Sequence, residues 1–372
     1  MPNLKLRRIF AAYIHTTEDM ERLKEEAVEL LLKLTAIPRV SRNEGDAADM
    51  LYGYMKDVCC LETHRDGNNL WTVAEDYDTS HPTLLLNAHI DTVKPVAGWV
   101  RTPQSPTVEG DRIYGLGCND DGASLVSLLQ VFRHLSKRAQ PYNLIFLASA
   151  EEEVSGKGGV EHVLPLLPPV SVALVGEPTG MQPAIAEKGL MVLDVTEHGK
   201  AGHAARNEGV NSIYLAMEDM RWFKEHKWER VSDLLGAVKM SVTIVNAGTQ
   251  HNVIPDTCIF TVDVRSNELY SNEELYGLIR QEVKGDVKAR SFRLNSSRID
   301  VSHPLVKRLV EMGRKPFGSP TLSDQTLMPF PSVKMGPGDS RRSHTADEYI
   351  CISEIHEAIE MYIRALDGLK IG

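Results

Sequence analysis

Four short apolar runs restrict the fold of this chain more than any other feature of its sequence. They are Thr83–Leu86, Leu144–Ala148, Val172–Val175 and Ser332–Met335. Runs of this length with almost no polar residue are typical of strands that are buried on both faces, as in a mostly parallel sheet. A helical pattern of apolar residues over 122–137 separates the first two runs. Strands that alternate with helices predict an α/β fold, a mostly parallel sheet flanked by helices.

The middle of the chain follows a different pattern, which indicates an inserted domain. The segments are predicted in the order strand 191–197, helix 211–224, strands 239–246 and 257–265, helix 272–283 and strand 288–294. This β-α-β-β-α-β order is ferredoxin-like. We therefore predict an inserted α+β domain at 187–296 that splits a catalytic domain formed by 1–186 and 297–372. A chain of 372 residues is long enough for this organisation.

Composition excludes several classes of partner. The formal net charge of -10 argues against nucleic acid and against anionic membrane surfaces, which both require basic patches. No apolar run approaches the ~20 residues of a membrane span, and the apolar run near the N-terminus is shorter than the core of a signal peptide. Five cysteines without C-x-x-C spacing indicate no disulfide framework. We therefore expect a cytoplasmic protein with no nucleic-acid or membrane partner.

Candidate metal ligands follow each of the four apolar runs. The polar segments are, in order, His89-Ile90-Asp91, Glu151-Glu152-Glu153, Gly176-Glu177 and Ser343-His344. In open α/β sheets ligands bind at the carboxyl ends of the strands, so these segments should meet at one edge. Asp120 lies in a glycine-rich turn, 115–122, that opens the helix after the first strand.

This set of side chains is suited to zinc, which binds imidazole nitrogen and carboxylate oxygen. A pair of ions ~3.5–4 Å apart, bridged by a carboxylate and a water, is the usual hydrolytic centre. Asp120, Glu153 and Glu177 would supply three negative charges against four positive ones, and a bridging hydroxide would complete neutrality. We predict two Zn²⁺ per subunit. Co²⁺ or Mn²⁺ stays an alternative, because the order of affinities does not decide which metal a protein holds in cells.

Taken together, the motifs resemble one enzyme superfamily. They are His89-x-Asp91, Gly115-x-Gly117-x-x-Asp120, Glu152-Glu153, Gly176-Glu177-Pro178-Thr179 and Ser343-His344-Thr345. This set is similar to that of the two-zinc aminoacylase, carboxypeptidase-G and acetylornithine deacetylase superfamily. In the insert, 199–203 and 252–256 resemble the signatures of its lid domain. The resemblance covers residues 17–370. One departure is an extra residue, Lys94, before Pro95, which is expected to reshape the adjacent loop.

The resemblance implies a division of roles among these residues. His89 and Glu177 would complete one metal site, Glu153 and His344 the other, and Asp120 would bridge them. Asp91 would orient the His89 ring, and Glu152 would be the general base. The acidic run Glu151-Glu152-Glu153 leaves the register open by one residue. Its spacing to the following glycines, Gly156 and Gly158, favours Glu152 as base and Glu153 as ligand.

For the substrate, the resemblance implies contacts from the insert and from a partner subunit. Asn252 and Arg265 would hold the free α-carboxylate, and Asp324 is a candidate for binding a cationic side chain. His203 would reach into the cleft of a second subunit in a homodimer formed through the lid domain.

The function that the resemblance implies is hydrolysis of the amide bond of a small N-acyl-L-amino acid. The overall similarity is greatest to acetylornithine deacetylase-like enzymes of arginine biosynthesis. N-acetyl-L-ornithine and N-succinyl-L-ornithine both stay open as substrates. A metallo-dipeptidase and a succinyl-diaminopimelate desuccinylase-like enzyme are alternatives with the same metal centre. A non-catalytic binding protein on this fold would have lost Glu152 or a ligand, and none is lost.

Overall fold

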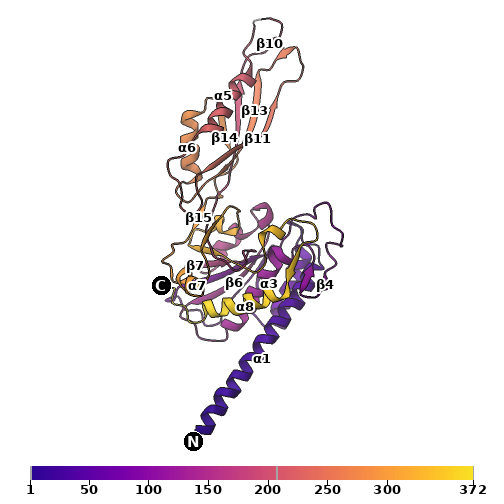
Figure 1. Ribbon diagram of the computed structural model, residues 1–372, viewed down its shortest axis with the longest axis vertical. Helices are drawn as coiled ribbons and strands as arrows, with labels where there is room; N and C mark the ends of the chain where they lie inside the picture. Colours follow the sequence, from indigo (N-terminus) through magenta and orange to yellow (C-terminus); the bar gives the residue numbers. More distant parts are fainter. Residues whose placement is uncertain (1, 207, 372) are drawn as a thin grey trace. The chain divides into compact units, whose positions relative to one another are not determined.

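The chain folds into two compact units, which are described separately. The computed structural model describes residues 2–206 and 208–371, with side chains from Asp19 onward (Figure 1). The first unit comprises residues up to Ala184, Asp300–Pro316 and Met328 onward, and the second comprises Ile185–Ile299 and Phe317–Leu327. Among the described residues, every helix is either too short or too polar to span a lipid bilayer.

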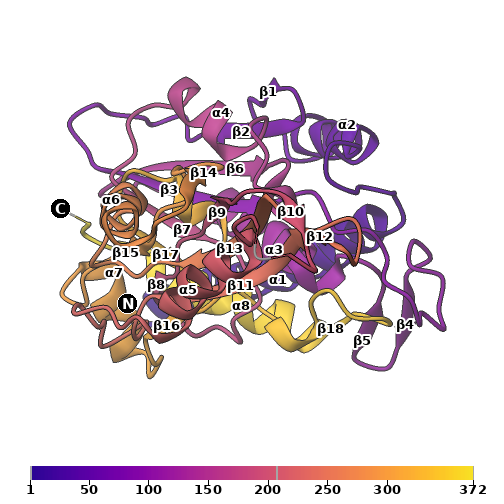
Figure 2. The ribbon, with the colours of Figure 1, turned by 90° about the horizontal axis from the view of Figure 1, so that it is seen from above.

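A mixed sheet with a parallel centre forms the first unit. Its four parallel strands lie in the order β6 (Asn143–Ser149), β3 (Thr83–His89), β7 (Val172–Val175) and β17 (Ser332–Lys334) (Figure 2). Antiparallel strands β2 (Asn69–Val73) and β1 (His64–Asp66) extend the β6 side, and β8 (Ala184–Glu187) begins beside β17. Every residue of β3, β6 and β7 is buried, as the apolar runs require. The predicted α/β class with a mostly parallel sheet is confirmed.

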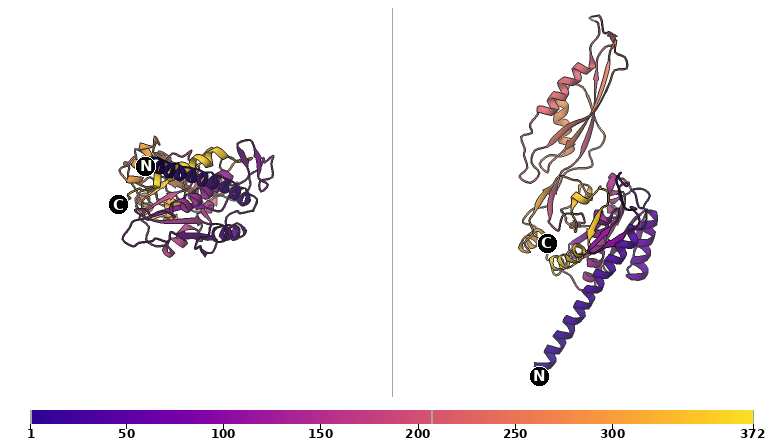
Figure 3. Two further views of the ribbon diagram at one scale, coloured as in Figure 1. Left: turned by 90° about the horizontal axis from the view of Figure 1, so that it is seen from below. Right: turned by 45° about the vertical axis from the view of Figure 1, so that its right-hand side comes forward.

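Three long helices pack together in this unit. They are α1 (Pro2–Thr35), α3 (Ala123–Leu135) and α8 (Ile352–Leu366), and α3 also packs on β3 and β6 (Figure 3). The smaller elements are α2 (Gly45–Gly53) with its π-helical extension (Tyr54–Val58), α4 (Val160–Val163), α7 (Pro304–Glu311) and the antiparallel strands β4 (Thr107–Glu109), β5 (Arg112–Tyr114) and β18 (Tyr349–Cys351). The sequence Thr16-Thr17-Glu18-Asp19 has the pattern of a capping box at a helix start, but α1 begins at Pro2, so Thr16 lies in its interior.

The second unit has the ferredoxin-like order of elements. These are β9 (Met191–His198), α5 (Ser212–Glu225), β11 (Lys239–Ala247), β13 (Thr257–Arg265), α6 (Asn272–Glu282) and β14 (Asp286–Ala289). The strands form an antiparallel sheet in the order β11-β13-β9-β14. Short strands β10 (Gly202–His203) and β12 (Val253–Ile254) pair with each other, and β15 (Ser297–Arg298) and β16 (Phe317–Ser319) pair with β8.

Alternation along the strands of this unit produces a one-sided core. Inward residues of β9 and β13, such as Leu193 and Phe260, are fully buried beneath Phe223 of α5 and Leu275 of α6. One predicted strand, 288–294, is shifted, because β14 ends at Ala289. Ala289 pairs with Leu193 of β9, and the N–H of Arg290 still donates to the carbonyl of Val192 (2.9 Å), so the pairing stops close to the start of β9 at Met191.

Two buried acidic side chains lie next to each other in the second unit. Glu197 at the end of β9 is 5% exposed, and Asp219 on α5 is 3% exposed. Asp219 accepts hydrogen bonds from the backbone N–H groups of Lys284 (3.0 Å) and Gly285 (2.9 Å). Burial and the neighbouring Asp219 raise the pKa of Glu197 from 4.5 to about 7. Glu197 therefore holds a proton in the folded unit at pH values where the unfolded chain has lost it.

This difference predicts a pH-dependent stability of the second unit. Because the folded pKa of Glu197 lies above its unfolded value, the free energy of unfolding should fall as pH rises from about 4.5 to about 7. A Glu197→Gln variant keeps the shape of the side chain but cannot titrate. Its melting temperature, measured by circular dichroism from pH 5 to pH 8, should rise relative to that of the wild type as pH increases. Parallel curves of melting temperature against pH for the two proteins would contradict the raised pKa of Glu197.

Candidate metal centre

The sheet brings the predicted ligands to one edge of the first unit. β3 ends at His89, and the segments after β6, β7 and β17 carry Glu153, Glu177 and His344. Because β6, β3, β7 and β17 are parallel neighbours, their carboxyl ends open on the same side. Two groups of side chains have ligand atoms within 4.8 Å of one another: His89, Asp120 and Glu153, and His89, Glu152 and Glu177.

Asp120 lies between the two histidines. Its Oδ1 is 3.2 Å from Nε2 of His89, and its Oδ2 is 3.7 Å from Nε2 of His344. Each oxygen of one carboxylate therefore faces a different imidazole, which is the arrangement that a bridging ligand requires. His89 and Asp120 are buried, whereas 52% of the His344 side chain is exposed.

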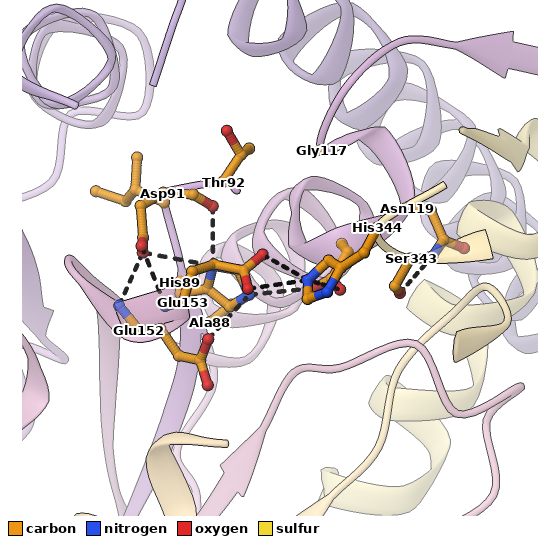
Figure 4. Close-up of polar contacts among 12 residues, drawn as sticks. Ala88, His89, Asp91, Thr92, Gly117, Asn119, Glu152, Glu153, Ser343 and His344 are labelled. Atoms are coloured by element: carbon orange, nitrogen blue, oxygen red, sulfur yellow. Dashed lines mark hydrogen bonds and ion pairs between the residues drawn. The ribbon is translucent and has the colours of Figure 1, made fainter. Parts of the chain in front are cut away.

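The two glutamates next to each other in sequence occupy different places. Glu153 contacts His344, with Oε2 2.9 Å and Oε1 3.2 Å from Nε2 (Figure 4). Oε2 of Glu152 is instead 4.0 Å from Nε2 of His89. His344 has a backbone φ of 57° and Glu151 one of 55°, in the left-handed region. Such conformations of non-glycine residues cost of order 1–3 kcal/mol and cluster at functional sites.

Asp91 organises the loops behind these candidate ligands. Nδ1 of His89 donates a hydrogen bond to the backbone oxygen of Asp91 (3.0 Å), which leaves Nε2 facing Asp120. The Asp91 carboxylate lies 3.5 Å from the same ring nitrogen, so it supports the His89 ring less closely than the backbone does. It accepts backbone N–H groups of Glu152 (3.0 Å) and Glu153 (3.2 Å). Asp91 thus connects the loop after β3 to the loop after β6.

The electrostatics of the cluster show that it attracts positive charge. Burial opposes a charged imidazole at His89, but the carboxylates of Asp120 and Asp91 raise its pKa well above 6.5. The hydrogen bond with Glu153 raises the pKa of His344 to about 9. Burial raises the pKa of Asp121 to about 8, and burial with the neighbouring Asp120 raises that of Glu177 well above 4.5. Divalent cations with nitrogen and oxygen ligands fit this donor set.

Two supporting side chains were missed by the sequence analysis. Oγ of Ser41 donates a hydrogen bond to Oδ2 of Asp91 (2.6 Å). Nδ2 of Asn119 donates to the backbone oxygen of Asp339 (3.2 Å) and to Oγ of Ser343 (3.3 Å), joining the Asp120 turn to the His344 loop. Asn119 directly precedes Asp120, but Ser41 is 50 residues away from Asp91, and no pattern in the sequence reveals contacts across such distances.

The other four predicted site residues belong to the second unit. His203 on β10 is exposed, and its Nδ1 accepts the backbone N–H of Ala205 (3.1 Å). Asn252 is also exposed and precedes β12, which pairs with β10. Arg265 ends β13, where Nε and Nη2 donate to both oxygens of Asp263 (2.8 and 3.1 Å).

The structure does not bring Asn252 and Arg265 together within one chain. Asn252 lies beyond the Thr257 end of β13, whereas Arg265 is at the other end of this nine-residue strand. At ~3.3 Å per residue the strand separates them by roughly 26 Å. Asp324 lies in a 3₁₀ turn (Asp324–Leu327) and is buried, so it is not a solvated loop residue.

The sequence of this chain is similar to those of known hydrolases. Residues 85–368 match the peptidase family M20/M25/M40. A [LysW]-lysine/[LysW]-ornithine hydrolase of Sulfurisphaera tokodaii is 26% identical over 94% of this chain and 98% of its own length. An acetylornithine deacetylase of Shigella sonnei is 26% identical over 91% of this chain and 96% of its own length.

A solved structure shows the same fold at lower identity. The YXEP protein of Bacillus subtilis, described as a dinuclear metal binding peptidase from the M20 family, superposes with a TM-score of 0.69. It is 17% identical, and the alignment covers 93% of this chain and 98% of that one. Together with the match over residues 85–368, these similarities place the chain in peptidase family M20/M25/M40, as a metallohydrolase of N-acyl amino acids or peptides.

Proposed function

We propose that this chain is a cytoplasmic two-zinc hydrolase that removes the acyl group from a small N-acyl-L-amino acid. The observation that carries the proposal is the Asp120 carboxylate, whose two oxygens face His89 (3.2 Å) and His344 (3.7 Å). A carboxylate shared between two imidazoles is suited to bridging a pair of ions. The excess of acidic groups around it supports a centre of high positive charge.

We assign the ligands in two sets around Asp120. His89 and Glu177 would hold one ion, since their ligand atoms belong to one group within 4.8 Å. Glu153 and His344, 2.9 Å apart, would hold the other. Zinc suits these donors, and Co²⁺ or Mn²⁺ could occupy the same positions. Ions bound there would polarise the scissile carbonyl and make a water molecule acidic enough to attack it.

Glu152 is proposed as the general base. Its backbone N–H is held by Asp91, and its carboxylate lies on the His89 side of the cluster, away from the contact between Glu153 and His344. From there it would accept a proton from the attacking water and deliver it to the nitrogen of the leaving amine. The proposal keeps Glu153 as ligand because Glu153 makes the direct contact with the second histidine.

The names of two relatives support ornithine as the amine product. One relative is a [LysW]-lysine/[LysW]-ornithine hydrolase and another an acetylornithine deacetylase, so the acyl parts differ while ornithine is common to both. We propose N-acetyl-L-ornithine, or its N-succinyl analogue, as the substrate in arginine biosynthesis. Arg265 would bind the α-carboxylate in place of Asp263, with which it now makes a bidentate pair. Asp324 would bind the cationic side chain.

We further propose that a second copy of the chain completes the active site. His203 and Asn252 lie near one end of β13 and Arg265 at the other, so one chain cannot bring all three to one small substrate. In a homodimer, one subunit would contribute the ligands and Arg265, and its partner His203 and Asn252. Strand β11 lies at the edge of its sheet and exposes Ile244 (49%) and Val245 (50%), which suits pairing with a second copy.

A substrate panel tests the proposed chemistry. Release of free amine should be fastest with N-acetyl- or N-succinyl-L-ornithine and much slower with dipeptides. Amidation of the α-carboxylate should lower kcat/KM strongly in the wild type, because Arg265 loses its charged partner. An Arg265→Ala variant should hydrolyse acid and amide at similar, low rates. Equal rates of the wild-type enzyme on acid and amide would rule out the carboxylate contact, and faster turnover of dipeptides would make the chain a dipeptidase.

Mixing inactive variants tests the shared active site. Glu152→Ala and His203→Ala proteins should each be nearly inactive as homodimers. After random subunit exchange half of the dimers are mixed, and one of the two sites in each contains both intact groups. Roughly a quarter of all sites should recover activity, an expectation that follows from two-fold symmetry. Exchange of Glu152→Ala with a Glu152→Ala/His203→Ala double variant is the control and should restore nothing. Verified exchange without recovery would show that His203 does not act in the partner's site.

A further inference from the structure

The turn that carries Asp120 is held from two sides by buried charged side chains that are not candidate ligands. Residues 117–120 lie between the segment after β3 and the beginning of α3. Arg39 and Glu348, each 2% exposed, contact the backbone of this turn. They come from opposite ends of the sequence, 39 shortly after α1 and 348 directly before β18.

Arg39 ties the His89 loop to the Asp120 turn. Nη1 donates to the backbone oxygen of Ile90 (2.5 Å), between His89 and Asp91, and Nη2 donates to the backbone oxygen of Gly117 (2.7 Å). The backbone of Arg39 is itself fixed, because its carbonyl accepts the N–H of Thr92 (2.9 Å). A planar guanidinium can hold two carbonyl groups at a set separation, which a lysine ammonium cannot do with the same geometry.

Glu348 holds the same turn through its N–H groups. Oε2 accepts the N–H of Gly117 (2.9 Å), and Oε1 accepts those of Asn119 (2.8 Å) and Asp120 (2.9 Å). Glu348 directly precedes β18, which pairs with β5, so its position depends on a hydrogen-bonded sheet. Three backbone donors leave the Asp120 peptide little freedom to rotate.

The glycine at position 117 is explained by the approach of Arg39. Gly117 has a φ of 75°, and an added Cβ would lie 2.3 Å from Cγ2 of Thr92 and 2.6 Å from Nη2 of Arg39. Any larger residue would displace the guanidinium. The second glycine of the Gly-x-Gly-x-x-Asp motif thus leaves room for the side chain that positions the motif's aspartate.

We propose that Arg39 and Glu348 are positioning residues that keep the Asp120 carboxylate between His89 and His344. We call them the turn clamp, and the inference rests on the proposed two-metal function. A bridging carboxylate must reach both ions at once, so displacement of the turn weakens both sites together. Residues that hold ligands in place without touching the metal typically contribute 10–100-fold in metal affinity or activity.

The test measures metal binding rather than turnover. Dissociation constants for Co²⁺ come from competition with a chelator at fixed pH, and the visible spectrum of the Co²⁺ protein reports coordination geometry. Arg39→Met and Glu348→Gln should each raise the dissociation constants of both Co²⁺ ions by about 10–100-fold and change the visible spectrum. Arg39→Lys, which keeps the charge without the fork, should give an intermediate loss. If Arg39→Met does not fold, Arg39→Lys and Glu348→Gln decide the question.

Arg133 provides a matched control in the same unit. It is also a buried arginine (8% exposed), and it contacts Glu26 on α1 and Oε1 of Gln130 (2.5 Å) without contacting a candidate ligand or its loop. Arg133→Met should lower the melting temperature but leave the Co²⁺ affinities and spectrum unchanged. If Arg133→Met lowered the Co²⁺ affinities as much as Arg39→Met does, Arg39 would act only through the general stability of the fold. This result would overturn the turn clamp.

Two further outcomes separate this inference from the proposed function. A wild-type protein that binds two ions, with folded Arg39 and Glu348 variants that bind them within about two-fold of wild type, would overturn the turn clamp alone. A wild-type protein that binds no pair of ions would overturn the proposed function, and the clamp with it.

Discussion

Mutual repulsion among carboxylates at one edge of a parallel sheet is the constraint on which this structure depends. The carboxyl ends of the parallel strands lie at the same edge of the sheet, so the acidic segments that follow β6, β3, β7 and β17 must meet there. Asp120 enters the same space from the turn before α3. Like charges this close are stable only with bound protons or cations, and the raised pKa values of His89 and His344 show the demand for positive charge. A pair of divalent ions would satisfy that demand and would supply hydrolytic chemistry.

The strands, and the meeting of the candidate ligands at one edge of the sheet, could be predicted because the apolar runs and the polar segments that follow them are local features of the sequence. Burial on both faces leaves uninterrupted apolar runs, and parallel topology fixes where those runs end, so His89 and Glu177 could be placed at one edge from the sequence alone. The order of elements in the insert was equally clear, because one-sided burial gives period-two alternation along β13. The end of β14 was not, since it depends on pairing with β9, which lies elsewhere in the chain.

The residues that support the ligands were beyond sequence analysis. Ser41 contacts Asp91 across 50 residues, and Glu348 contacts Gly117 across 231. A single serine, arginine or glutamate in a loop carries no periodicity, and its partner is defined only by the folded backbone. For Arg265, the position could be predicted from the sequence but the interaction partner could not. Its position at the end of β13 was correctly predicted, but its pairing with Asp263 two residues away is seen only in the structure.

The account is tested most directly by locating the metal ions themselves. Anomalous diffraction at the zinc absorption edge, from crystals of zinc-loaded protein, should show two peaks about 3.5–4 Å apart on either side of the Asp120 carboxylate. One peak should lie beside His89 and Glu177 and the other beside His344 and Glu153, with Glu152 bound to neither. A single peak, or a peak bound by Glu152 in place of Glu153, would contradict this assignment of the centre.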